Sequence, residues 1–598
     1  MTIFEVWAPE KTVKLRLSGS AASLGAAGSA GSLGAVDSVG EDREMERGDD
    51  GWWRLDVPSA GPGTDYAYVL PDGDNGLPDP RSQWQPQGVH GPSRVYDQSA
   101  FAWADSSWTG RQLPGSVLYE LHVGTFTPAG TFDAAIAHLD HLVSLGVDMV
   151  ELLPVNSFNG EYNWGYDGVG WYAPHEVYGG PDGLKRFVDA AHGRGIGVVL
   201  DVVYNHFGPS GAYAPSFAPY LSTAGSNPWG ASVNLDGPQS DEVRRYIIDN
   251  VLMWLRDYHV DGLRLDAVHA LVDHSAINLL EQMAVEVETL SVSVGRPLSL
   301  IAESDLNDPR LITPREAGGL GLQAQWDDDV HHALHTLLTG ERQGYYGDFG
   351  SLSCLQTVLE GAFYHADTWS SFRQRRHGRT IDRSTIPGHR FVAYLQNHDQ
   401  IGNRAIGDRI SATLSPGLLK VGATLLLTSP FTPMLFMGEE WAASSPWQFF
   451  TSHPEPELAA AVQTGRRREF AAHGWASEDV PDPQDPATFE RSKLDWNERD
   501  KPGHAEILGL YRKLIALRRS RSDLSNPWLD KVEVWHGDQY VVMRRGQCAV
   551  AANLAGVPQT VSLRAVPSKV LLATEPGVVL QRDRVDLPPE TAVVVAFR

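Results

Sequence analysis

Val117-Leu-Tyr-Glu-Leu121 is a short apolar run that is followed by a helical pattern and then by a second apolar run, Met149 to Val155. Between the two runs, apolar residues from Ile136 to Val143 recur at helical spacing, and Gly146 marks the end of that helix. A strand, a helix and another strand in this order form a βαβ unit, which makes its two strands parallel.

The same pattern continues along the chain as far as Met437. Further apolar runs predict the remaining strands, which are Gly197–Val203, Leu263–Val268, Leu298–Glu303, Leu322–Trp326, Phe391–Leu395 and Met434–Met437. Together the runs predict an α/β fold whose core is a closed (β/α)8 barrel, or TIM barrel. After the third strand, residues 205–238 are rich in Pro, Gly and Ser, and we expect this long connection to cover the barrel mouth.

Short β-like runs separated by Gly and Pro lie on both sides of the barrel. We expect a β-sandwich of immunoglobulin type in residues 1–112, the barrel with loop insertions in residues 113–497, and a helix followed by a β-domain in residues 498–598. The stretch Ser18 to Gly40 consists almost entirely of Ser, Ala, Gly and Leu. It buries too little apolar area to offset its chain entropy, so it is predicted to be a loop without an assigned function.

The chain of 598 residues carries 49 Lys and Arg against 74 Asp and Glu, a formal net charge of -25. This negative charge repels nucleic acids and anionic membranes, whereas neutral substrates such as sugars are compatible with it. The two cysteines, Cys354 and Cys548, are too few for a disulfide framework. The chain also lacks the pattern of an export signal and an apolar run of membrane-spanning length, so we expect a cytoplasmic protein.

Polar residues end four of the predicted strands, and the chemistry of such barrels lies at the C-terminal ends of the strands. The four ends are Asp201-Val-Val-Tyr-Asn-His206, Arg264-Leu-Asp266, Ala302-Glu303 and Gln396-Asn-His-Asp399. Taken singly, each acidic residue is more often a turn former or a helix cap, and each histidine an ordinary hydrogen-bonded side chain. Their coincidence on four strands of one barrel predicts a polar site at its mouth.

Arg264 and Asp266 are two positions apart in a predicted strand, so both side chains point to the same face. The cation favours the ionised carboxylate of Asp266, which suits a nucleophile. Glu303 ends the adjacent strand and is expected to reach the same cavity. Cleavage of a glycosidic bond requires two carboxyl groups with opposite protonation states, roughly 5 to 5.5 Å apart for retention of configuration and roughly 6.5 to 9.5 Å for inversion.

In order and approximate spacing, these strand ends resemble the four short motifs of the α-amylase family of glycoside hydrolases. The resemblance implies that Asp266 forms a covalent glycosyl intermediate, that Glu303 is the general acid and then the general base, and that Asp399 holds the sugar hydroxyls. It requires no cofactor and no catalytic metal. The side chains expected to bind the substrate are Tyr166, His206, Arg264, His269, His398 and Gln400.

Several other segments are more similar to the trehalohydrolase branch of this family than to branching enzymes or ordinary amylases. They are residues 79–91, residues 159–168 with 172–175, residues 325–332 with 339–342, and residues 437–441 with 449–453. After Asp266 the chain continues Ala-Val-His269-Ala270, where amylases typically place a Lys-His pair that grips the leaving sugar. The resemblance implies hydrolysis of the α-1,4 bond next to the terminal trehalose of maltooligosyltrehalose, which releases trehalose and a shortened maltooligosaccharide.

Other interpretations are compatible with parts of the sequence. A 1,4-α-glucan branching enzyme, or another α-1,4-glucan hydrolase or transferase, would share the barrel and the carboxylates. A non-catalytic glucan-binding scaffold is a different class, but such proteins normally lose the carboxylates that this chain retains. His331, His332 and His335 are compatible with a metal site, whereas the interpretation that we favour is a helix whose first turn is capped by Asp327 to Asp329.

Overall fold

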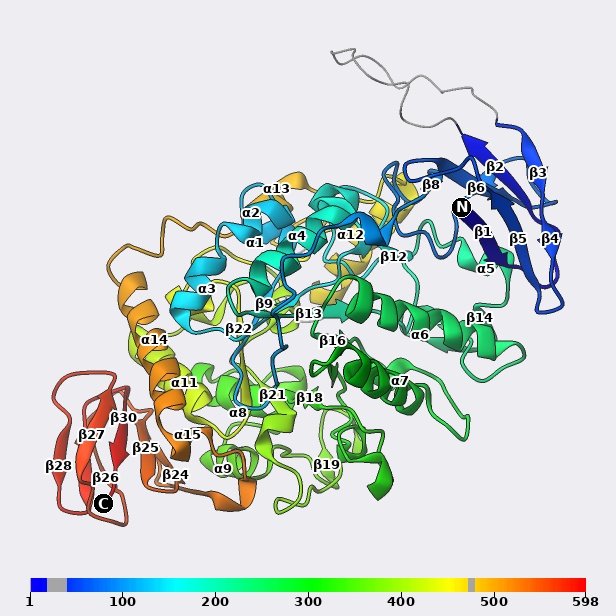
Figure 1. Ribbon diagram of the computed structural model, residues 1–598. Coiled ribbons are helices and arrows are strands. Elements are labelled where there is room, and N and C mark those ends of the chain that lie inside the picture. Colours follow the sequence, from blue (N-terminus) through cyan, green and yellow to red (C-terminus); the bar gives the residue numbers. More distant parts are fainter. Residues whose placement is uncertain (1, 19–39, 472–478) are drawn as a thin grey trace.

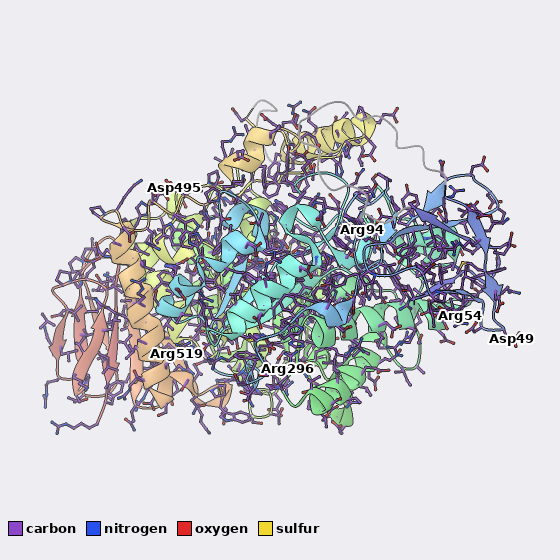
Figure 2. The ribbon with its side chains drawn as sticks, turned by 45° about the horizontal axis from the view of Figure 1, so that its top comes forward. Asp49, Arg54, Arg94, Arg296, Asp495 and Arg519 are labelled. Atoms are coloured by element: carbon purple, nitrogen blue, oxygen red, sulfur yellow. The ribbon has the colours of Figure 1, made fainter. Side chains whose placement is uncertain are left out.

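The computed structural model describes residues 2–18, 40–471 and 479–598. The chain runs from an N-terminal β-rich region through a central barrel to a C-terminal helix and a second β-rich region, and the two β-rich regions lie at opposite ends of the molecule (Figure 1). Figure 2 shows Arg54 at the N-terminal end and Arg519 near the C-terminal sheets. The low-complexity stretch that is predicted to be a loop lies almost entirely outside the described residues. Every helix in the described part of the chain is too short or too polar to cross a membrane.

Parallel strands close into an eight-stranded barrel in the order β10-β13-β16-β17-β18-β21-β22-β9, which confirms the predicted fold. The strands are β9 Leu118–Leu121, β10 Met149–Leu152, β13 Gly197–Val202, β16 Gly262–Leu265, β17 Ser299–Ala302, β18 Ala324–Trp326, β21 Phe391–Ala393 and β22 Thr432–Phe436. Several strands end earlier than predicted. Asp266 and Glu303 therefore follow their strands directly, at the barrel mouth.

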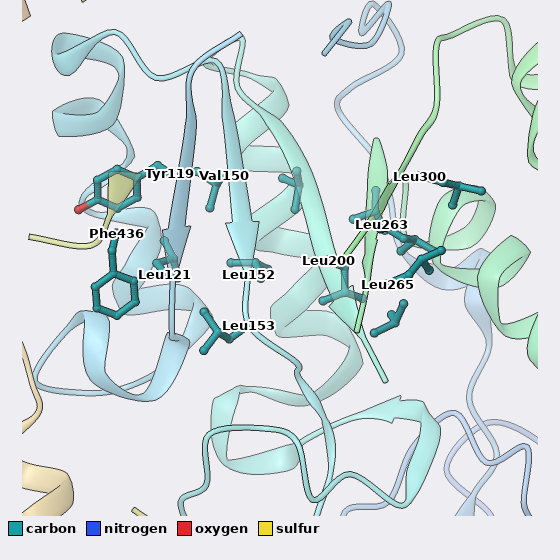
Figure 3. Close-up of a cluster of buried hydrophobic side chains, with 14 of the residues drawn as sticks. Tyr119, Leu121, Val150, Leu152, Leu153, Leu200, Leu263, Leu265, Leu300 and Phe436 are labelled. Atoms are coloured by element: carbon teal, nitrogen blue, oxygen red, sulfur yellow. The ribbon is translucent and has the colours of Figure 1, made fainter. Parts of the chain in front are cut away.

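Side chains alternate between the barrel interior and the surrounding helices. The outward-facing side chains, such as Tyr119 and Leu152, belong to a large apolar cluster between the strands and the helices (Figure 3). An apolar layer fills one level of the interior; its members include Leu118, Met149, Val199, Ile301, Val392 and Met434. Two positions further along three of these strands, the buried side chains become acidic, namely Glu120, Glu151 and Asp201. These three acidic side chains thus lie in the barrel interior directly above the apolar layer, on the side of the barrel mouth.

Two helix termini lie where the sequence predicts them. Gly146 ends α3 in the left-handed conformation, with a φ of 101°, and Asp327 caps α8 by accepting a hydrogen bond from the backbone N–H of Val330. The helices are α1 Val123–Phe126, α2 Phe132–Ile136, α3 Leu139–Leu145, α4 Gly180–His192, α5 Ala214–Phe217, α6 Ser240–Asp257, α7 Leu279–Val294, α8 Asp328–Thr339, α9 Leu352–Gly361, α10 His398–Gly402, α11 Pro416–Thr428, α12 Pro456–Ala471, α13 Pro486–Arg491, α14 His504–Ser520 and α15 Ser522–Ser525.

The N-terminal region contains two sheets, ordered β1-β5-β4 and β3-β2-β6-β7 with β8 beside β6. Their strands are β1 Thr2–Trp7, β2 Lys14–Ser18, β3 Asp42–Glu44, β4 Glu46–Arg47, β5 Trp52–Val57, β6 Asp65–Val69, β7 Gly76–Leu77 and β8 Ser93–Arg94. The β-rich flanks are confirmed. The exact domain limits and the immunoglobulin type of the sandwich stay predictions.

The C-terminal region follows α14 with two further sheets, ordered β23-β24-β25-β30-β27 and β26-β29-β28. Their strands are β23 Val532–His536, β24 Tyr540–Arg545, β25 Cys548–Asn553, β26 Gln559–Ser562, β27 Lys569–Ala573, β28 Val579–Gln581, β29 Arg584–Leu587 and β30 Thr591–Ala596. The connections between barrel strands also contain small two-stranded sheets. They are β11 Asn156–Ser157 with β12 Gly170–Pro174, β14 Leu221–Asn227 with β15 Gly230–Val233, and β19 Thr368–Ser370 with β20 Arg375–His377.

Candidate active site

Arg264, on β16, is fully buried and organises the acidic residues of the site. Its Nη1 donates hydrogen bonds to both carboxylate oxygens of Asp201, at 2.9 and 3.0 Å, and to Oδ1 of Asp266 at 2.7 Å. Its Nη2 lies 3.7 Å from Oε2 of Glu303. The guanidinium also lies over the ring of Trp326, 4.2 Å from the ring centroid. One buried cation therefore brings together three carboxyl groups from neighbouring strands.

Asp266 accepts a hydrogen bond at each of its oxygens. Arg264 occupies Oδ1, and the side-chain amide of Asn205 donates to Oδ2 at 2.7 Å. A carboxylate accepts at both oxygens without a proton of its own, and the guanidinium of Arg264 adds a positive charge, so these two donors favour the ionised form. The side chain of Asp266 is 12% exposed, which leaves it accessible from the barrel mouth.

Glu303 differs from Asp266 in its protonation. Burial raises the pKa of Glu303 to about 8, because the opposing charge of Arg264 is offset by Asp266, Asp399 and Asp328. Near neutral pH this carboxyl group retains its proton. The backbone N–H of Ala267, the residue after Asp266, donates to its Oε2 and so fixes one oxygen of the group. The two carboxyl groups that the sequence pairs thus have the opposite states that glycosidic cleavage requires.

The raised pKa of Glu303 predicts the high-pH side of the activity profile. If the protonated form of Glu303 is the active one, kcat/KM stays high below the folded-state pKa and falls tenfold per pH unit as the pH rises through about 8. The measurement is kcat/KM for glucan hydrolysis against pH, with thermal unfolding recorded at each pH as the control. An activity loss that is centred near pH 4.5, where an ordinary glutamic acid titrates, would contradict this assignment.

His398 and Tyr166 lie beside this group and contact each other. Their rings stack with centroids 5.2 Å apart, and Nε2 of His398 lies 2.8 Å from the Tyr166 hydroxyl. That hydroxyl donates to Oδ2 of Asp201 at 2.7 Å. Nε2 of His398 also lies 3.5 Å from Oδ1 of Asp399, whose side chain is 47% exposed. The predicted sugar-binding residues of the seventh strand are therefore linked to the carboxylates around Arg264.

His206 follows β13 and is held from two sides. Its Nε2 lies 3.0 Å from the backbone oxygen of Tyr166, and its ring stacks on Trp229 with centroids 5.5 Å apart. Trp229 lies in the turn of the β14–β15 hairpin, and the neighbouring Asn227 donates to the backbone oxygen of Asn205 at 2.7 Å. The long connection after the third strand therefore reaches the site, as the sequence predicts.

Two of the predicted substrate-binding residues lie further from the carboxylates around Arg264. Gln400 donates to Oδ1 of Asp328 at 3.3 Å, and Asp328 is one of the charges that raise the pKa of Glu303. His269 lies in the short 3-10 helix Val268–Ala270, with Nε2 4.0 Å from Oδ1 of Asp305, and is not among the residues that contact Arg264. Gln400 is thus joined to the site through Asp328, whereas His269 marks its edge.

The sequence motifs include Asp201 and Asn205, to which no role was assigned, and Asp328 was predicted only as part of a helix cap. Glu120 was not predicted as a site residue. Glu120 carries a usable signal, because a lone acidic residue inside an otherwise apolar strand must either find a partner or stay neutral. Trp326 and Trp229 carry no comparable signal. Their place depends on how the sixth strand and the hairpin pack against their neighbours.

Two of the three histidines of α8, His331 and His335, have hydrogen-bond partners within the protein. His331 has Nδ1 at 2.7 Å from the backbone oxygen of Leu395 and Nε2 at 2.9 Å from the Tyr346 hydroxyl. Nε2 of His335 lies 2.8 Å from Oε2 of Glu341. These contacts and the Asp327 cap confirm the helix interpretation of this segment.

The closed parallel barrel with paired carboxyl groups at its mouth defines a catalytic domain of the α-amylase type. Residues 94–218 match the family model described as alpha amylase, catalytic domain. Over 585 residues the chain is 54% identical to the malto-oligosyltrehalose trehalohydrolase of Mycobacterium tuberculosis, with 97% of this chain and 96% of that protein covered. The chain belongs to the malto-oligosyltrehalose trehalohydrolase family and is a glycoside hydrolase, as its motifs predict.

Two further comparisons show similarity at lower sequence identity. The solved structure of a candidate alpha amylase from Salmonella typhimurium superposes with a TM-score of 0.88 at 39% identity, covering 99% of this chain and 97% of that one. A 1,4-alpha-glucan branching enzyme of Corynebacterium jeikeium is 27% identical over 441 residues, which are 67% of this chain and 57% of that protein. The branching enzyme that the sequence left open as an alternative is thus a distant relative.

Proposed function

We propose that this protein hydrolyses the α-1,4 bond next to the terminal trehalose of maltooligosyltrehalose, with retention of configuration. The observation that carries the proposal is the contact of one buried guanidinium with an ionised Asp266 and with a Glu303 that retains its proton. That single group touches both carboxyl groups, which favours the short separation of a retaining enzyme over the wider one of an inverting enzyme. The choice of trehalose as leaving group rests on the family to which the chain belongs.

The proposed reaction has two steps. The Asp266 carboxylate attacks the anomeric carbon, the bond to the trehalose oxygen breaks, and Glu303 gives its proton to that oxygen. Trehalose leaves, and the maltooligosyl chain stays bound to Asp266. Glu303, now ionised, takes a proton from water, the water oxygen bonds to the anomeric carbon, and Asp266 departs as a carboxylate. A maltooligosaccharide is released and both groups return to their starting states.

The surrounding side chains have proposed roles in binding. Asp399 and His398 hold hydroxyls of the sugar that is cleaved, and Arg264 keeps Asp266 charged. His206 is proposed to contact the reactive sugar, and Tyr166, which is partly exposed and stacks on His398, is proposed to stack on it. We propose that Gln400 and His269 bind the trehalose that leaves. Gln400 contacts Asp328 and His269 lies near Asp305, so both residues lie at the periphery of the site.

The test of the proposal is incubation with maltotriosyltrehalose and, separately, with amylose. We expect free trehalose and maltotriose from the first substrate at a rate far above the hydrolysis of amylose. New α-1,6 branches in amylose would identify a branching enzyme, and binding without any cleavage would identify a non-catalytic scaffold. An amylase that degrades amylose faster than it releases trehalose would retain the mechanism but contradict the proposed substrate.

We also propose that the protein acts in the cytoplasm, in the biosynthesis of trehalose. Cys354 and Cys548 are both unpaired and buried, which suits a reducing compartment. The formal charge of -25 agrees with a neutral glucan as the partner and disfavours nucleic acid.

A further inference from the structure

Two glutamic acids lie side by side inside the barrel, beneath the candidate active site. Glu120 on β9 and Glu151 on β10 are paired in the strand register, and each is 1% exposed. Glu120 is fully engaged, because its Oε2 accepts a hydrogen bond from the backbone N–H of His398 and its Oε1 lies 2.5 Å from Nδ1 of the same residue. In the described part of the chain, neither carboxyl oxygen of Glu151 has a hydrogen-bond partner. The two glutamic acids therefore occupy equivalent positions on neighbouring strands, but among the described residues only Glu120 has hydrogen-bond partners for its carboxyl group.

We propose that Glu120 is a positioning residue that keeps His398 in its doubly protonated form, so that His398 binds Asp399 and the sugar as a cation, while Glu151 stays neutral and has no such role. This proposal rests on the proposed hydrolysis at Asp266 and Glu303. Glu120 acts through His398 and does not touch the substrate itself.

The donors and acceptors around His398 are all satisfied when both ring nitrogens carry protons. The hydroxyl of Tyr166 has one hydrogen, which goes to Asp201, so the hydroxyl oxygen accepts from Nε2 of His398. On the other side of the ring, Glu120 already accepts from the backbone N–H of His398. In the proposed state Glu120 is a carboxylate, which only accepts hydrogen bonds, so Nδ1 donates to its Oε1. A histidine that donates from both nitrogens is an imidazolium.

The charges that face His398 support the same state. Burial lowers the pKa of His398 and so does Arg264, but Glu120 and Asp399 outweigh them and raise it to about 9. The rings of Trp164, Trp326 and Trp447 enclose the imidazole and contribute no titrating group.

For Glu151, burial and the neighbouring charges favour the neutral form. Burial, together with the charges of Glu120 and Asp201, raises the pKa of Glu151 well above its usual value. A neutral carboxylic acid carries no charge that could hold His398 in its protonated form. Glu151 therefore provides a natural control for Glu120 in the same barrel layer.

The informative variant is Glu120→Gln, which preserves shape and removes the charge. The amide oxygen can still accept from the backbone N–H of His398, but the amide nitrogen then faces Nδ1 as a donor. His398 is left as the neutral tautomer with its proton on Nε2. The hydrogen bonds survive while the positive charge next to Asp399 disappears.

The experiment compares Glu120→Gln with the matched variant Glu151→Gln in the full-length protein. We expect Glu120→Gln to lower kcat/KM near neutral pH by about 10- to 100-fold, the equivalent of one charge-assisted hydrogen bond, and to move its high-pH loss to lower pH. Glu151→Gln should stay within about twofold of the parent, because a neutral group replaces a neutral group. Equal losses in both variants, or an unchanged pH profile in Glu120→Gln, would overturn the proposal.

A direct measurement separates this inference from the identity of the substrate. Nitrogen-15 NMR of the histidine side chains, with His398→Gln to assign the signal, reports ring protonation without any sugar present. We expect the parent and Glu151→Gln to keep His398 protonated above pH 8, toward its pKa of about 9, and Glu120→Gln to lose that proton. If Glu120→Gln does not fold, Glu120→Asp should retain the imidazolium with a reduced rate. A neutral His398 in the parent would reject the proposal even if trehalose is released.

Discussion

Asp266→Asn lowers the rate of maltotriosyltrehalose cleavage by at least about 10^4-fold, because an amide cannot form the glycosyl ester on which the two-step reaction depends. The fold should survive the substitution. Arg264 keeps its two hydrogen bonds to Asp201, and the Asn205 amide keeps a bond to the backbone oxygen of Asp266 at 3.1 Å. The measurement is single-turnover release of trehalose, with the thermal unfolding midpoint as the control for folding.

A second variant at the same position tests the role of nucleophile itself. Asp266→Gly leaves room for a small anion, so added azide should restore turnover and give a glycosyl azide of inverted configuration. Retention of more than about one hundredth of the parent rate in Asp266→Asn, without azide, would assign the attack to another group.

Glu303→Gln lowers cleavage of maltotriosyltrehalose by about 10^3-fold, within the usual range for the loss of a general acid. A maltooligosyl fluoride needs no protonation of its leaving group, so its first step should be largely spared. The second step still lacks its base, and the glycosyl form of Asp266 should accumulate after a burst of fluoride. The activity that remains on the natural substrate should lose its dependence on the ionisation near pH 8, because the titrating group is gone.

The two variants together distinguish the assigned roles. If Glu303→Gln loses the same factor on the fluoride and on the natural substrate in the burst phase, Glu303 is not the acid of the first step. If Asp266→Asn shows a fluoride burst, Asp266 is not the nucleophile. Exchange of the two roles would contradict the protonation states that Arg264 and burial impose on these carboxyl groups.

The sequence by itself determined the fold class and the central pair of carboxyl groups. The period of two in a strand places Arg264 and Asp266 on one face, and the repeated βαβ units make neighbouring strands parallel, so their polar ends meet at one mouth. These are local rules that need no knowledge of distant contacts. The proposed trehalose specificity rests on the family motifs, because no periodicity contains it.

Only the tertiary structure decided the protonation states and the supporting contacts. Closure of the barrel brings β9 beside β22 and places Glu120 against His398, although 278 positions separate the two residues in the chain. The protonated state of Glu303 depends on how deeply it is buried and on charges from other strands. Burial and through-space charge are properties of the closed barrel, so no local pattern along the chain encodes them.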